Sequence, residues 1–76
     1  MGKAIWYNVK CWDEGREDDM FITQNTILRS AAEEDFLRYF DDYKFTQLIK
    51  YRGDTIGDTN SSSVVVLELI NHNYDI

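Results

Sequence analysis

Hydrophobic and polar residues alternate along residues 3–12 of the chain. One set of alternate positions consists of Ile5, Tyr7, Val9 and Cys11. The other set consists of Trp6, Asn8, Lys10 and Trp12. A period of two with β-branched and aromatic residues predicts a β-strand that buries one of its faces. We expect the first set to face the core.

The following segment is predicted to reverse the chain as a hairpin. Residues 13–19 contain Gly15 and no apolar side chain, which is typical of a connection between two strands. Residues 20–28 alternate again, with Phe21, Thr23 and Asn25 on one side, although the alternation fades near Asn25. We therefore expect a second strand over residues 20–28.

A helix is predicted over residues 31–42. Ser30 and Glu33 form the S-x-x-E pattern of a capping box, in which the serine hydroxyl accepts a hydrogen bond from the amide of residue 33. The acidic residues 33–35 would then lie in the first turn, where the helix dipole favours negative charge. One stripe of the helical period is apolar and consists of Ala32, Phe36, Leu37, Phe40 and Tyr43.

Residues 44–52 fit two patterns. Alternation of Phe45, Gln47, Ile49 and Tyr51 with the intervening residues fits a strand, whereas spacing from Tyr43 through Gln47 to Tyr51 would continue the helix. We prefer the strand because the segment is rich in β-branched and aromatic residues.

The last third of the chain is predicted to form a loop and a further strand. Residues 53–63 contain two glycines and a run of serines, which indicates a loop, and residues 64–70 are mostly β-branched or aliphatic. If Glu68 faces water, Val65, Leu67 and Leu69 face the core. Residues 71–76 show no clear pattern.

The order of these elements predicts the fold class. Residues 1–76 should form a single small α+β domain, a two-layer ββαββ arrangement with a four-stranded, mainly antiparallel sheet and one helix covering one face. The other face would be open, and exposed apolar area of that extent usually marks an interface unless the tail covers it. The apolar residues assigned to it are Trp6, Trp12, Leu48, Val64, Val66 and Ile70, with Asn8, Lys10, Lys50, Arg52 and Glu68 among them.

Negative charge is concentrated in two short runs. The chain has 14 acidic and 8 basic residues, a net charge of −6 and a pI near 4.5. The first run is Asp13, Glu14, Glu17, Asp18 and Asp19; the second is Glu33, Glu34, Asp35, Asp41 and Asp42. Such a field attracts basic partners and disfavours direct binding to nucleic acid or to an anionic membrane.

The residue types that carry chemistry are few. Cys11 lies on the predicted core face, where a thiol is usually inert, and His72 has no evident acidic partner. The acidic loop 13–19 lacks the ligand spacing of a calcium loop. We therefore expect no enzymatic activity, no metal and no cofactor. A single cysteine and the lack of a bilayer-length apolar run favour a reducing, cytoplasmic location without membrane contact.

In size, acidity and lack of catalytic residues, the chain resembles small phage-encoded inhibitors of host nucleases, polymerases or CRISPR complexes. The resemblance is one of class, and it implies stoichiometric inhibition by occupying a basic, nucleic-acid-binding surface of a partner protein. As a nucleic-acid mimic, the chain would place its carboxylates where the partner protein otherwise binds the phosphates of nucleic acid. The alternative is a homodimer formed through the open sheet face, with charge serving solubility. The residues expected to bind a partner are Asp13, Glu14, Glu17, Asp18, Asp19, Glu34, Asp41, Asp42, Trp6 and Trp12.

Overall fold

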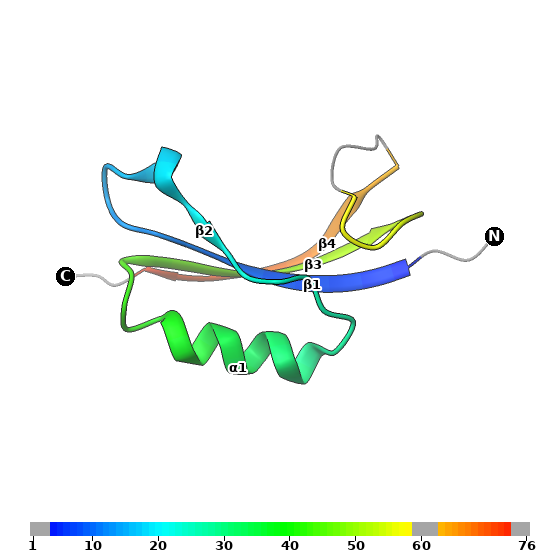
Figure 1. Cartoon of the computed structure of the whole chain (residues 1–76), viewed down its shortest axis with the longest axis horizontal. Helices are drawn as coiled ribbons and strands as arrows, with labels where there is room; N and C mark the ends of the chain where they lie inside the picture. The colour runs from blue at the N-terminus through cyan, green and yellow to red at the C-terminus, as the bar shows by residue number, and fades with distance from the viewer. Residues whose placement is uncertain (1–3, 59–62, 74–76) are drawn as a thin grey trace.

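The computed structural model describes residues 4–58 and 63–73, and it confirms the predicted α+β fold. These residues form β1 (Ala4–Trp12), a short 3-10 turn (Glu17–Asp19), β2 (Phe21–Ile22), α1 (Arg29–Tyr39), β3 (Phe45–Gly53) and β4 (Val65–Asn73). The strands make an antiparallel sheet in the order β2-β1-β3-β4, and α1 covers one face of it (Figure 1). Residues 45–52 of the ambiguous segment thus belong to a strand, as preferred.

The hairpin between β1 and β2 is present, but β2 is shorter than residues 20–28. Regular pairing is limited to Lys10 with Ile22 and Cys11 with Phe21, followed by a single bridge between Tyr7 and Thr26. Between these points the Thr23 hydroxyl accepts a hydrogen bond from the Val9 amide at 2.9 Å. A side chain therefore takes the place of a backbone acceptor, which interrupts the ladder.

The helix begins and ends earlier than predicted, and the predicted capping box is wrong. Ser30 lies inside α1, Leu28 is the N-cap residue, and no side chain caps the helix by a hydrogen bond. The Leu28 amide instead donates to the Thr26 hydroxyl at 3.1 Å. The first turn of α1 contains no acidic residue, so the dipole does not account for Glu33 as expected. Residues 40–42 form a turn after the helix.

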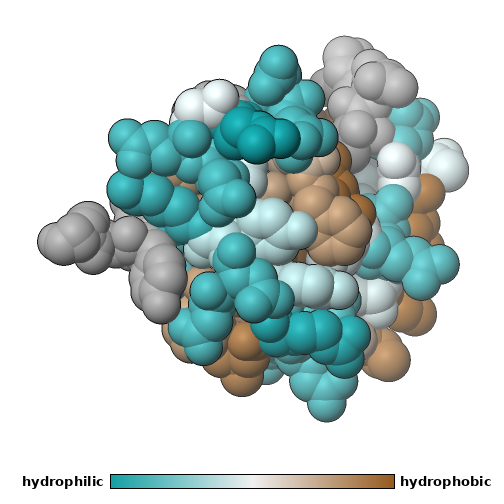
Figure 2. Space-filling model, turned by 60° about the vertical axis from the view of Figure 1, so that its left-hand side comes forward, coloured by the Kyte–Doolittle hydropathy of each residue, from teal (hydrophilic) through white to brown (hydrophobic). Residues whose placement is uncertain are grey.

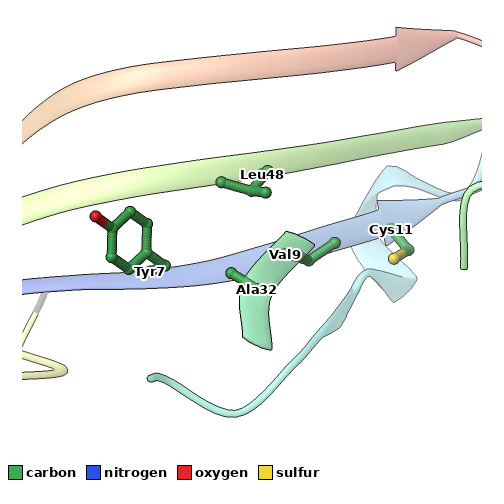
Figure 3. Packing of buried hydrophobic residues seen from close by; sticks show 5 residues of the cluster. All are labelled: Tyr7, Val9, Cys11, Ala32 and Leu48. Atoms are coloured by element: carbon green, nitrogen blue, oxygen red, sulfur yellow. The ribbon is translucent and has the colours of Figure 1, made fainter. Parts of the chain in front are cut away.

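The main core lies between α1 and the sheet, as Figure 3 shows for Tyr7, Val9, Cys11, Ala32 and Leu48. The first set of β1 positions does face the helix, as predicted. The predicted faces of β3 and of the second half of β4 are wrong, because the register places Val9 beside Leu48 and Leu48 beside Ile70. Leu69 therefore lies on the face away from α1, and Val65, Leu67 and Leu69 are all exposed instead of buried.

Glu68 explains why the face of β4 was misassigned. Its carboxylate lies on the helix side, next to Lys50 in the register, and pairs with Arg29 of α1 at 2.6 Å. The assumption that Glu68 faces water put Leu69 and Ile70 on the wrong sides of the sheet.

A second apolar cluster lies on the sheet face away from α1. It contains Trp6, Ile49 and Tyr51, with Ala4 and Val64 packed against it. Trp6 has no exposed surface, so the expectation that it is exposed on an open face is wrong. The chain after β3 returns over this face, and Val64 and the Trp6 ring both lie close to Gly53.

Candidate partner-binding surface

The fold brings parts of the two acidic runs to one end of the sheet. The backbone amide of Lys44 donates to Asp13 Oδ1 at 3.1 Å, and Lys44 Nζ contacts Glu14 Oε1 at 2.7 Å. These contacts place the start of the β1–β2 connection beside the turn that follows α1, and both segments lie at the left end of the sheet in Figure 1. We call this surface the acidic end and define it as Asp13, Glu14, Asp18, Asp19, Asp41 and Asp42.

Tyr43 lies between the two runs and is influenced by both. Its pKa is raised mainly by burial and further by nearby negative charges, including those of Asp13 and Asp42. Carboxylates that are distant in sequence thus act on one phenol. Together with the contacts of Lys44 to Asp13 and Glu14, this indicates that parts of both acidic runs lie at the same end of the sheet.

Not all carboxylates of the acidic end are neutralised locally. Asp19 pairs with Arg16 at 3.0 Å, and the hydrogen bond and charge of Lys44 lower the pKa of Glu14. Asp18, Asp41 and Asp42 are exposed and make no ion pair with another residue of the described chain. These three charges remain open to an external cation.

Aromatic and apolar side chains lie among these charges. Phe21 is 40% exposed and contacts the Tyr39 and Tyr43 rings at centroid distances of 5.2 and 6.3 Å. A hollow of about 330 Å³ is lined by Asp13, Arg16, Asp19, Met20, Phe21 and Tyr43. Figure 2, in which this end comes forward, shows hydrophobic surface surrounded by hydrophilic residues.

Such a hollow suits a long cationic side chain. Lysine and arginine carry an apolar stem and a charged head, so they can lie along Met20 and Phe21 while the head meets Asp13. Aromatic faces add a cation–π attraction.

Several residues expected to bind a partner lie elsewhere. Glu34 is exposed on α1, away from the acidic end, and Trp6 is buried. Trp12 is half-buried on the sheet face opposite α1, where it stacks on Phe45 at 5.4 Å. The side chain of Glu17 lies outside the described part of the structure.

The sheet face opposite α1 carries a polar hollow that sequence reasoning missed. Tyr51 Oη donates to Asn8 Oδ1 at 3.1 Å, and Asn8 Nδ2 donates to Asn25 Oδ1 at 2.9 Å. Burial raises the pKa of Tyr51, and the hydrogen bond to Asn8 partly offsets this shift. The hollow has a volume of about 270 Å³ and is lined by Asn8, Lys10, Ile22, Thr23, Asn25, Tyr51 and Gly57. No spacing along the chain signals this network, because it joins three separate segments.

The groups best suited to chemistry are not arranged for it in the described residues. Cys11 is fully buried, and burial, followed by the charges of Asp35 and Asp42, raises its pKa from 9.0 to about 11. Its reactive thiolate is thus suppressed at neutral pH. His72 packs edge-on against Phe40 at 4.8 Å. Across residues 4–58 and 63–73, no three His, Cys, Asp or Glu side chains are grouped to hold a metal ion.

Comparisons with known proteins give no relative for this chain. No protein-family model, curated protein or solved structure matches it. Within the described residues, α1 is neither long nor apolar enough to span a membrane.

Proposed function

We propose that the chain is a non-enzymatic protein-binding module that docks its acidic end on a basic surface of a partner protein. A basic surface of this kind ordinarily binds nucleic acid. By occupying that surface in the cytoplasm, the module acts as a phage-type inhibitor. The observation that carries the proposal is that the 13–19 connection and the turn after α1 meet at one end of the sheet, where Lys44 contacts Asp13 and Glu14. A hollow with both acidic and aromatic walls lies at the same end.

Charge and shape contribute separately to this docking. The unpaired carboxylates Asp18, Asp41 and Asp42 steer a basic partner and raise its association rate. The hollow beside Phe21 then accepts one arginine or lysine side chain, which provides a desolvated anchor of the kind that dominates binding energy. The polar rim and central anchor together resemble the usual anatomy of a protein interface.

The test is affinity capture with the full chain and two charge-matched variants. Asp41→Asn with Asp42→Asn removes two charges from the acidic end. Glu33→Gln with Glu34→Gln removes two charges from α1 instead. A partner should be retained by the wild type and by the α1 variant, lost by the acidic-end variant, and released as salt rises to about 0.5 M.

A competition experiment addresses the mimicry of nucleic acid. Heparin, a polyanion, should displace the captured partner, because both would occupy the same basic surface. Equal retention by the two variants, retention unaffected by salt and heparin, or no retained partner would each count against the proposal.

A further inference from the structure

The two edges of the sheet differ in length and in protection. The β2 edge has two regular residues and then becomes irregular. β4 extends from Val65 to Asn73 and pairs with β3 along one side. On its other side, no strand of the described residues pairs with it. That side therefore presents a row of backbone amide and carbonyl groups able to pair with another strand.

The side chains of β4 strengthen this conclusion. Val65, Val66, Leu67 and Leu69 are 40 to 52% exposed. Single exposed aliphatic residues are ordinary, but four within five consecutive positions make the exposed surface of this strand unusually apolar. Proteins usually protect a long edge with lysine or proline, and β4 has neither.

An irregularity in the register gathers part of this apolar surface on one face. Tyr51 lies beside Val66, whereas Ile49 lies beside Leu69, so β4 uses one extra residue over this interval. Because Tyr51 and Ile49 share a face of the sheet, Val66 and Leu69 share it too, next to the second cluster. The regular part of the free edge extends from Glu68 to Asn73.

The charge distribution indicates which partner can pair with this edge strand. Glu68 is the one charged residue of β4, and its carboxylate is already paired with Arg29. A basic partner therefore finds no free carboxylate there. A second copy of this chain also carries a net charge of −6, which would repel the first copy. The two copies avoid this repulsion when their acidic ends stay apart.

We infer that two copies of the chain pair antiparallel along β4 and join their sheets into one of eight strands. The acidic end lies near the C-terminal end of β4, where Asn73 pairs with Phe45. An antiparallel pair about a two-fold axis therefore places the two acidic ends at opposite ends of the joined strands. The regular residues 68–73 span roughly 20 Å, more than twice the screening length of about 8 Å at physiological salt.

This dimer is distinct from one formed through the open sheet face. Leu48 and Ile70, assigned to that face from the sequence, belong to the cluster on the α1 side instead, and Trp6 is buried. The edge pair leaves the acidic end of each copy free to bind a partner. The inference consequently does not depend on the proposed function.

The test is the mass of the full chain in solution, measured by sedimentation at about 0.1 to 1 mM. The wild type should sediment as a dimer, and Val66→Lys with Leu69→Lys as a monomer. Leu37→Lys is the matched control, because Leu37 is 63% exposed on α1, and it should remain dimeric. Circular dichroism shows whether each variant is folded.

Hydrogen exchange provides a second readout. Within residues 68–73, the amides directed away from β3 should become more protected as the protein concentration rises, and this dependence should vanish in the lysine variant. A monomeric wild type at 1 mM, or a dimer that survives both lysines, would overturn the inference. Asp41→Asn with Asp42→Asn should leave the mass unchanged, which separates a failure of this inference from a failure of the proposed function.

Discussion

Trp6 shows how the burial of one side chain depends on a distant segment. Its alternation with Tyr7 gave its face correctly, and that face points away from α1. It is buried because Tyr51 stacks on it at 5.4 Å and because Val64, which follows the loop after β3, packs against the same cluster. Trp6 is therefore a core residue of the second face and not an anchor for a partner.

Replacing Trp6 with alanine should destabilise the fold by about 3–5 kcal/mol, the usual loss for a large aromatic residue in a core. Trp12→Ala should cost clearly less, because Trp12 is half-buried. Denaturant unfolding followed by circular dichroism measures both losses. Similar small losses for the two variants would show that Trp6 does not belong to a packed core.

Among the elements, α1 is joined to the sheet by an ionic contact as well as by apolar packing. Arg29, the first residue of α1, contacts Glu33 at 2.9 Å and Glu68 of β4 at 2.6 Å. This contact links the start of the helix to the edge strand. It also accounts for an acidic residue on the helix side of β4.

The contact predicts how stability depends on pH. The hydrogen bond and charge of Arg29 lower the pKa of Glu68 in the folded state. A lowered folded-state pKa means that the contribution is present above the unfolded-state value and is lost as pH falls through the folded-state value. Glu68→Gln should therefore reduce the free energy of unfolding at pH 7, and the difference from wild type should shrink at about pH 3.

Glu34→Gln is the control for this experiment. Glu34 is exposed and makes no ion pair with a described residue, so its replacement should give no comparable pH-dependent difference. A loss in Glu68→Gln that stays constant between the two pH values would contradict the role assigned to the Arg29 contact.

The sequence predicted the elements better than their contacts. Alternation located β1 and β3, and the apolar stripe located α1, because these periods are local properties of the chain. The faces of β3 and β4 depend on register, which Leu48 and Ile70 establish only once paired across the sheet. The acidic residues were recognised from the sequence, but the hollow beside Phe21 was not, because Tyr43 and Met20 meet there from different segments.

At the scale of the whole molecule, unfavourable charge is gathered at one end. Asp41 and Asp42 follow the C-terminus of α1, where the helix dipole disfavours negative charge. The charges of Asp42 and Asp13 both act on Tyr43. This arrangement costs stability, whereas the same number of carboxylates dispersed over the surface would serve solubility at a smaller cost.

Replacing Asp41 and Asp42 with asparagine should therefore raise the free energy of unfolding by about 0.3–1 kcal/mol per charge at low ionic strength. The gain should fall as salt is added, because these charges are exposed and screened. Thermal unfolding at two salt concentrations measures both effects. The control is Glu33→Gln with Glu34→Gln, which removes two charges but leaves the repulsion at the acidic end unchanged. This control should give no such gain in stability. If the acidic end binds a partner as proposed, the same asparagine variant becomes more stable but loses binding. If the variant instead lost stability as well as binding, Asp41 and Asp42 would belong to the structural framework of the fold.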